Sequence, residues 1–254
     1  MNFDIYNTFY GNRHISVTST AGDPANGIIE HHSEMSFNSE VSHIYKILNS
    51  LPDNAVIMDG GANLGYITVP MALKLKNTNA KIISIEAQRR MFYALAGTIA
   101  LNDLYNVHAY NLALGEERGF VDMPDTDYGA NTDFGSISVS GKANEMSYLN
   151  NTTTLMVTID SLKLPRLDFL KLDVEGYEPA ALRGGLETIR ANRPWMWIEY
   201  YDCVSTYNQD KIKAILEPLG NYSFHYLKVD RQNMLCIPNE KREGVNLDFI
   251  AEPV

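Results

Sequence analysis

Hydrophobic runs alternate with amphipathic segments along most of the chain. Five short apolar runs predict buried β-strands, at 55–59, 81–86, 107–114, 167–173 and 195–200. Segments with apolar residues at helical spacing separate or flank these runs, at 38–51, 64–76, 88–103, 178–191 and 208–220. Strands that alternate with helices form right-handed βαβ units, so the pattern predicts an α/β fold around a parallel sheet.

Three regions depart from this alternation. Residues 115–157 are rich in Gly, Asp, Asn, Ser and Thr and contain short β-like pieces, which predicts a variable, antiparallel β insertion. The segments 222–229 and 233–238 predict a closing β-hairpin. Residues 1–37 are polar and turn-rich, with one short strand expected at 13–20. We therefore expect an N-terminal extension or lid at 1–37 and one large domain at 38–254.

Composition and charge narrow the classes of partner. The net charge of −10 and the pI near 5.0 argue against binding to nucleic acid or to an anionic membrane surface, since both need clustered Lys and Arg. The N-terminus lacks the pattern of a signal peptide, and no apolar run reaches the ~18 residues of a membrane span. Cys203 and Cys236 form no CxxC pair, so we expect no zinc site and two free thiols. These features predict a soluble, cytoplasmic protein.

The stretch "VIMDGGANLGYIT" at 56–68 runs from the first strand into a glycine-rich turn, where a ligand can approach the backbone closely. The dinucleotide pattern G-x-G-x-x-G fits weakly, because Ala62 stands at the second glycine. The pattern D-x-G-x-N-x-G fits better. An acid directly before the turn suits a ligand with an ammonium group, such as S-adenosylmethionine (SAM). This pattern comprises Asp59, Gly61, Asn63 and Gly65.

Glu86 ends the second strand, 27 positions after Asp59. An acid at the tip of this strand accepts hydrogen bonds from the two hydroxyls of a ribose. NAD and SAM both carry that diol, so Glu86 indicates a nucleoside ligand without choosing between the two.

The stretch "DFLKLDVEGYEPAALRGG" at 168–185 carries the remaining candidate chemistry. Lys171 and Asp173 point to one face of the fourth strand, and Asp173 falls at its carboxyl end, where ligands bind in such sheets. Glu175 and Glu178 follow in the turn and the first helical turn, where acids also cap a helix and complement its dipole. Asp173 is therefore the best-placed reactive carboxylate in the chain.

Together, "DGGANLGYIT", "ISIEA", "NLALG" and "LDFLKLDVEGYEPAALRGG" resemble the FkbM family of SAM-dependent methyltransferases over roughly residues 38–201. The resemblance implies the class I methyltransferase Rossmann-like fold: a seven-stranded, mostly parallel sheet in the order 3-2-1-4-5-7-6, with strand 7 antiparallel and helices on both faces. It also implies methylation of hydroxyl groups on sugars or other small molecules. In place of the family's usual Glu-Pro this chain has Glu86-Ala87. The implied SAM-binding residues are Asp59, Gly61, Asn63, Gly65, Glu86 and Ala113.

Methylation of a hydroxyl requires removal of a proton from a weak acid, so a base or a metal is needed. Asp173 is the predicted base, and Lys171 either tunes it or binds substrate. In the second mechanism, Asp173 and Glu199 hold Mg²⁺ or Ca²⁺, which prefer carboxylate oxygens. The alternative function is that of an NAD-dependent oxidoreductase or epimerase with a Rossmann fold.

The acceptor is expected to be a small molecule or carbohydrate, bound by the regions that match nothing specific, 1–37 and 120–155. His31, His32, Ser39 and Glu40 are candidates for a lid over the site. Tyr66 either packs on the cofactor or lines the acceptor cleft. The sequence gives no indication of the oligomeric state.

Overall fold

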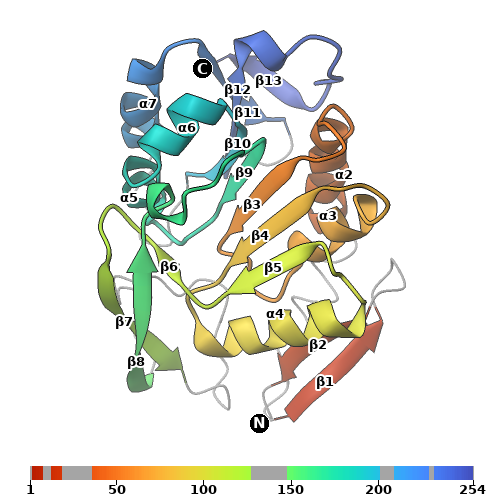
Figure 1. Cartoon of the computed structure of the whole chain (residues 1–254), viewed down its shortest axis with the longest axis vertical. Coiled ribbons are helices and arrows are strands. Elements are labelled where there is room, and N and C mark those ends of the chain that lie inside the picture. Colours follow the sequence, from red (N-terminus) through yellow and green to blue (C-terminus); the bar gives the residue numbers. More distant parts are fainter. Residues whose placement is uncertain are drawn as a thin grey trace.

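The computed structural model describes residues 2–7, 13–18, 36–126, 148–200, 209–228 and 232–253. Its centre is a mixed sheet of eight strands (Figure 1). From one edge to the other the strands are β13 (Ile250–Pro253), β11 (Tyr222–Leu227), β12 (Asn233–Pro238), β10 (Trp195–Glu199), β9 (Phe169–Leu172), β3 (Val56–Gly60), β4 (Lys81–Ile85) and β5 (Val107–Tyr110).

The order of the strands confirms the predicted topology. Counted along the chain from β3, the first seven strands of the sheet run 3-2-1-4-5-7-6, and β12, the seventh, is antiparallel to β10. The sequence did not predict β13, which extends the sheet by pairing antiparallel with β11. The sheet thus has eight strands instead of seven.

The strand predicted at 107–114 is divided in the structure. β5 ends at Tyr110, and β6 (Ala113–Leu114) belongs to a different sheet. Between them the side-chain amide of Asn111 donates hydrogen bonds to the carbonyls of Glu86 and Ala87, at 2.8 and 3.1 Å. These bonds hold the chain against the end of β4 while it leaves the central sheet. The segment predicted as one strand therefore contains a change of sheet at Asn111.

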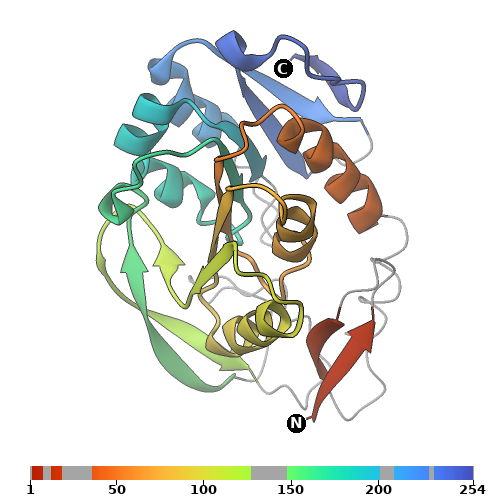
Figure 2. The same ribbon diagram turned by 45° about the vertical axis from the view of Figure 1, so that its right-hand side comes forward.

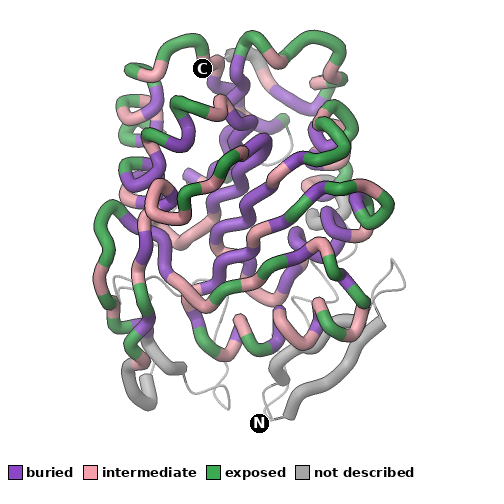
Figure 3. The backbone as a smooth tube through the Cα atoms, viewed as in Figure 1, coloured by how far each residue is buried: buried purple, intermediate pink, exposed green. Residues whose placement is uncertain are grey.

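Helices cover both faces of the sheet, as predicted (Figure 2). One core cluster joins α2 and α3 to side chains such as Ile57 and Trp197, and the other joins α5, α6 and α7 to side chains such as Met58 and Met196. β9 is buried throughout, which explains its unbroken apolar character apart from one lysine (Figure 3). The helices are α2 (Ser36–Leu48), α3 (Thr68–Lys74), α4 (Arg89–Leu101), α5 (Glu178–Arg183), α6 (Leu186–Asn192) and α7 (Gln209–Leu216).

Two helix predictions need correction. The helix predicted at 64–76 begins only at Thr68, since the residues before it form the glycine-rich turn. Pro70 is therefore in its first turn, where no backbone donor is lost. The helix predicted at 178–191 is broken at Gly184 and Gly185. A Cβ at Gly184 would lie 2.1 Å from the carbonyl oxygen of Gly115, so the helix ends where two backbones meet.

A second sheet has the order β6-β8-β7, with β7 (Gly119–Thr126) antiparallel to β8 (Tyr148–Val157). The predicted antiparallel pieces near 119–123 and 154–160 fall largely in these two strands, while the piece at 135–140 lies outside the described residues. β1 (Asn2–Asn7) and β2 (Arg13–Thr18) pair antiparallel, and β2 is the strand predicted at 13–20. The division into 1–37 and 38–254 stays a prediction. No helix in the described ranges is long and apolar enough to span a membrane.

Candidate functional site

A cavity lies at the carboxyl ends of β3, β4 and β9, the edge of the sheet at which the sequence places its conspicuous acids. Most of the predicted site residues line it. Those that do are Asp59, Gly61, Asn63, Glu86, Ala113, Lys171 and Asp173, with Glu40, Tyr66 and Glu175 beside them. Gly65 is not among the residues that line this cavity, and its predicted contact with a cofactor stays a prediction.

The glycine-rich turn is built around two close approaches. Gly61 has a φ of 80°, and a Cβ there would lie 1.7 Å from the carbonyl oxygen of Asp173. Its N–H donates to the carbonyl of Ile85 at 2.9 Å. Gly65 has a φ of 93°, and its Cβ would lie 2.9 Å from a methyl carbon of Leu95 in α4. Both positions therefore need glycine, for conformation and for space.

Glu86 is held by the turn that it faces. Its Oε2 accepts a hydrogen bond from the N–H of Asn63 at 2.7 Å, and its Oε1 accepts one from the N–H of Gln88 at 2.7 Å. The side chain is only 5% exposed, and this burial raises the pKa of Glu86 to about 7, although the two N–H groups act in the opposite direction. Glu86 thus titrates near neutral pH and is fixed at the tip of β4.

A buried lysine joins two carboxylates at the base of the cavity. The ammonium of Lys171 lies 3.0 Å from Oδ2 of Asp173 and 3.9 Å from Oδ1 of Asp59. Burial alone would lower the pKa of Lys171, but the carboxylates of Asp173 and Asp59 outweigh it and raise that pKa. The sequence predicted that Lys171 and Asp173 share one face of the strand, which is confirmed. It gave no sign that Asp59 joins them, since this contact depends on the pairing of β3 with β9.

Asp59 has two different oxygens. Oδ2 accepts a hydrogen bond from the hydroxyl of Thr68 at 2.6 Å. Oδ1 is buried and has no hydrogen-bond partner among the described residues. Burial raises the pKa of Asp59, and the nearby ammonium of Lys171 opposes that shift. A fully buried carboxylate on the wall of a cavity, with one oxygen that accepts no hydrogen bond from the described residues, is suited to a ligand that brings a hydrogen-bond donor or a positive charge.

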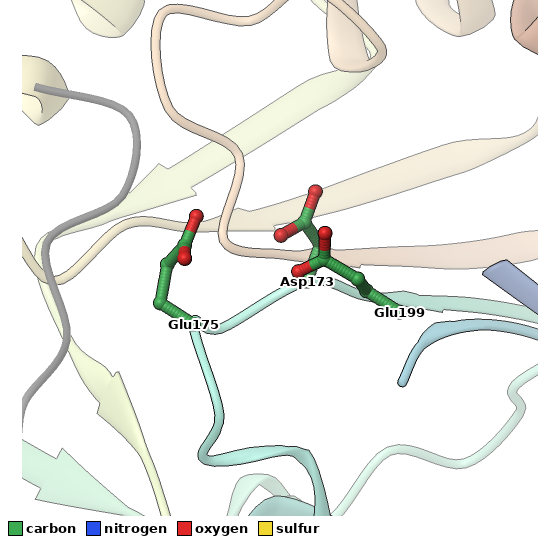
Figure 4. A group of neighbouring side chains, drawn as sticks. All are labelled: Asp173, Glu175 and Glu199. Atoms are coloured by element: carbon green, nitrogen blue, oxygen red, sulfur yellow. The ribbon is translucent and has the colours of Figure 1, made fainter. Parts of the chain in front are cut away.

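Three carboxyl groups lie close together next to the ion pairs of Lys171 (Figure 4). They belong to Asp173, Glu175 and Glu199. One oxygen from each lies within 4.8 Å of the others. Burial and the neighbouring carboxylates of Asp173 and Glu175 raise the pKa of Glu199 far above its usual range. Glu199 therefore keeps its proton and shares a hydrogen bond with Asp173. We call these three residues the acidic rim.

Asp173 stays ionised within this group. Burial would raise its pKa, but the ammonium of Lys171 and the hydrogen bond from Glu199 outweigh burial and lower it. Its side chain is 34% exposed, in contrast to the buried Lys171 and Asp59. Asp173 is thus an ionised carboxylate that the cavity can reach. The predicted metal pair of Asp173 and Glu199 is close enough to share an ion, but here the two share a proton.

The two acids of the turn after β9 have different roles. Oε1 of Glu178 accepts hydrogen bonds from the N–H groups of Val174 and Gly176, at 2.7 and 3.3 Å, so Glu178 ties the turn to α5. Both donors precede α5, so Glu178 fixes the turn from the first residue of the helix, where an acid also complements the helix dipole. Glu175 has a left-handed φ of 54° and lines the cavity instead. Sequence spacing alone does not distinguish the two.

Several candidates lie elsewhere or were missed. His31, His32 and Cys203 are outside the described residues, and Ser39 belongs to α2. Cys236 is buried with a free thiol. The apolar wall formed by Leu112 and Met123 was not predicted as part of the site. Leu112 could have been predicted as a lining residue, because it stands in "NLALG" directly before the predicted Ala113.

Comparison with known proteins gives a consistent result. The family model described as "Methyltransferase FkbM domain" matches residues 59–226. "Methyltransferase 1" of Beauveria bassiana (strain ARSEF 2860) is 26% identical over 151 residues, which cover 52% of this chain and 59% of that protein. "Methyltransferase sdnD" of Sordaria araneosa is 28% identical over 172 residues, which cover 56% of this chain and 64% of that protein. The chain thus spans less than two thirds of either relative.

Among solved structures, the crystal structure of methyltransferase FkbM from Methylobacillus flagellatus KT superposes with a TM-score of 0.52. The two chains are 18% identical, and the match covers 83% of this chain and 60% of the other. At that identity the likeness supports the fold alone. The region matched by the family model begins at Asp59 and contains the glycine-rich turn, Glu86, Lys171 and the acidic rim.

Proposed function

Because this chain belongs to the FkbM family of methyltransferases, we propose that it is a SAM-dependent methyltransferase that acts on a hydroxyl group of a sugar or another small molecule. Family membership also favours SAM over NAD as the ligand proposed for the glycine-rich turn. What remains to be argued is how the residues of the cavity suit SAM and why the acceptor atom is an oxygen.

The cavity has features that suit SAM. Gly61 leaves the backbone of the turn open to a ligand, and Glu86 offers carboxylate oxygens to the ribose hydroxyls. Oδ1 of Asp59 is 3.9 Å from the ammonium of Lys171 and accepts no hydrogen bond among the described residues, so it is free to accept one from the ammonium group of the methionine part. Bound SAM would supply a methyl group on a sulfonium, which is already activated for transfer. The remaining task of the protein is to hold the acceptor in line and to remove its proton.

Asp173 is the proposed base, and its ionised state is the observation that carries the proposal. Lys171 keeps the carboxylate of Asp173 charged. The side chain of Asp173 is partly exposed, so a ligand in the cavity can reach it. A hydroxyl group placed within hydrogen-bond distance would pass its proton to Asp173 as the new C–O bond forms, while the bond between the methyl carbon and sulfur breaks and S-adenosylhomocysteine leaves as the neutral thioether. An amine acceptor that binds as the neutral base would not need such a carboxylate, so this arrangement favours oxygen.

A divalent cation is the second candidate for the same step. The acidic rim offers three carboxyl groups within reach of one ion, and Mg²⁺ and Ca²⁺ prefer such ligands. Lys171 already neutralises Asp173, and Glu199 holds a proton that an ion would have to displace. These two observations favour the metal-free mechanism.

The acceptor is proposed to bind over the second sheet and the N-terminal region. Ala113 and Leu114 in β6 and Met123 in β7 are residues of that sheet that line the cavity. Neither nucleic acid nor a membrane is proposed as a partner, in line with the net charge of −10.

The test is methyl transfer from SAM to a panel of sugars, polyols and phenols, with matched amines, followed by NMR of the product. We expect S-adenosylhomocysteine to form only with hydroxyl compounds, and the new methyl signal to have the chemical shift of an O-methyl group. An N-methyl or C-methyl product would refute the assignment to oxygen. Failure to bind SAM at all, measured by calorimetry, would refute the proposed function as a whole.

A further inference from the structure

A groove lies on the other side of the turn that follows β9. It encloses about 620 Å³, within the size range of sites for small molecules. Residues of α5, α7 and the second sheet line it, and these elements lie on the left in Figure 1. Residues 173–175 line the cavity described above, whereas the next two residues of the chain, Gly176 and Tyr177, line the groove. One short turn therefore separates the cavity from the groove.

The backbone of this turn fixes the division. Glu175 and Gly176 both have positive φ, of 54° and 89°, so the chain bends sharply between a residue of the cavity wall and a residue of the groove wall. The buried carboxylate of Glu178 accepts hydrogen bonds from two N–H groups of the turn and holds it in this shape. Because four residues span at most ~14 Å, the Cα atoms of Asp173 and Tyr177 are no further apart than that.

The two walls of the groove are joined by direct packing. At the end of α5, a Cβ on Gly184 would lie 2.1 Å from the carbonyl oxygen of Gly115, which follows β6. A Cβ on Gly115 would in turn lie 2.4 Å from the sulfur of Met156 in β8. The ion pair of Arg183 with Glu116, at 2.7 Å, also joins α5 to the second sheet. Backbone packing therefore holds the walls in place before any ligand binds.

The groove differs from the cavity in charge. Among the described residues that line it, two carboxylates and two cationic groups cancel in formal charge: Glu116, Glu117, Arg183 and Lys211. The described wall of the cavity has five acids and one lysine. A balanced wall with both donors and acceptors favours neither an anion nor a cation. It suits a neutral ligand rich in hydroxyl groups, because each hydroxyl both donates and accepts hydrogen bonds.

Apolar side chains line the groove between these charged groups. Tyr177 is partly exposed, and Pro179 and Ala180 lie beside it in the first turn of α5. An aromatic ring has a negative face, which attracts the weakly positive C–H groups on the face of a sugar ring. The hydroxyls at the edge of such a ring can then reach the charged neighbours. An aromatic side chain among carboxylates and cations is therefore suited to a carbohydrate.

We propose that the groove is a subsite for the part of the acceptor that is not methylated, and that the acceptor is a neutral oligosaccharide rather than a free monosaccharide. This inference rests on the proposed function, since it takes Asp173 as the residue that binds the reacting hydroxyl. An oligosaccharide that presents one hydroxyl to Asp173 passes the turn and lays its next units along Tyr177. The groove thus selects for the length of the acceptor.

NMR of protein labelled with ¹³C in the methionine methyl groups tests this, because Met156 lines the groove and Met123 lines the cavity. The variants Met156→Leu and Met123→Leu assign the two signals. Maltotriose, cellotriose, xylotriose and triacetylchitotriose are titrated to about 10 mM, each beside its monosaccharide, so that weak binding is detected. We expect at least one trisaccharide to shift the Met156 signal saturably and its monosaccharide to leave that signal unchanged. SAM should shift the Met123 signal.

Tyr177→Ala should weaken binding of that trisaccharide about 3- to 10-fold through loss of the ring contact, with SAM affinity unchanged. Tyr177→Phe keeps the ring and should bind like the wild type. Tyr105→Ala is the matched control, because Tyr105 is 86% exposed in the turn between α4 and β5 and should affect neither ligand.

Three outcomes would overturn the inference: no trisaccharide shifts the Met156 signal, monosaccharide and trisaccharide shift it alike, or Tyr177→Ala binds the trisaccharide as tightly as the wild type. A wild-type protein whose Met123 signal does not respond to SAM would instead count against the proposed function.

Discussion

Replacement of Lys171 by methionine tests the charge arrangement at the base of the cavity. Methionine has a similar length and fills the same space without an ammonium group. In the variant, Asp59 is fully buried beside an apolar side chain, and its donors among the described residues are the hydroxyl and the backbone N–H of Thr68. Asp173 loses its partner as well, but one third of its side chain is exposed, so water replaces the ammonium there.

The expected cost follows from these two environments. At an effective dielectric constant of about 20, the 3.9 Å between Lys171 and Asp59 corresponds to ~4 kcal/mol of attraction. Removal of one partner from a buried pair typically costs about 3–5 kcal/mol. Because solvent screens Asp173, we take the lower end and expect Lys171→Met to reduce the free energy of unfolding by about 3 kcal/mol near pH 8.

The cost should depend on pH in a defined direction. Burial raises the pKa of Asp59 above its value in the unfolded chain, and loss of Lys171 raises it further. The folded variant then binds a proton that the unfolded chain does not, so its stability is lost as pH rises through the folded-state pKa and returns as pH falls. The difference between variant and wild type should therefore shrink between pH 8 and pH 5.

Urea unfolding followed by circular dichroism, at pH 8, 7, 6 and 5, measures this difference. Lys81→Met is the matched control, since Lys81 is exposed at the start of β4, and should change stability by less than about 0.5 kcal/mol. The double variant Asp59→Asn/Lys171→Met should recover part of the loss, because the buried charge is gone. A loss below about 1 kcal/mol, or one that is the same at pH 5 and pH 8, would refute the proposed coupling.

Three further predictions concern ligand binding and turnover. Glu86→Ala should weaken SAM binding by about 1.5–3 kcal/mol, and wild-type affinity should fall as pH drops through about 7, where Glu86 takes up a proton; unchanged calorimetric affinity in both cases would contradict this role. Asp173→Asn should lower turnover ~10²–10⁴-fold with little change in SAM affinity, because Asp173 is proposed to act on the acceptor hydroxyl and not on the donor; wild-type turnover would leave Asp173 without a role as base. A chelator should not change the rate, and Glu199→Gln should be milder than Asp173→Asn; loss of activity on chelation with recovery in Mg²⁺ would establish the metal mechanism instead.

The alternation of apolar runs predicted most of the strands and helices, and the resemblance to the FkbM family implied the order of the strands, which the structure confirms. The exact boundaries of the helices and strands depend on packing between distant parts of the chain, which the hydrophobic pattern does not show. The helix break at Gly184 depends on a backbone approach from Gly115, and the departure of the chain after β5 depends on Asn111 reaching back to β4. β13 lies at the edge of the sheet, where two residue pairs with β11 define its register.

The same distinction applies to the site. Asp59, Glu86 and Asp173 were predicted because each ends a strand, and strand ends meet at one edge. The ion pair of Lys171 with Asp59 was not predicted, because it requires the register between β3 and β9. The different roles of Glu175 and Glu178 depend on two consecutive residues with positive φ in the turn, Glu175 and Gly176. Spacing shows which residues are near the edge, and only the turn geometry shows where each points.

The contact of Gly61 with the backbone of Asp173 has a consequence for attempts to redesign this protein. The turn proposed to bind the donor and the turn that carries the proposed base touch without any intervening side chain. A mutational library that varied the first turn would also displace the second, so donor and acceptor preferences would change together. Leu112 and Met123 line the same cavity from outside these turns. Diversity introduced at those two positions would reshape the acceptor side while the shared backbone stays intact.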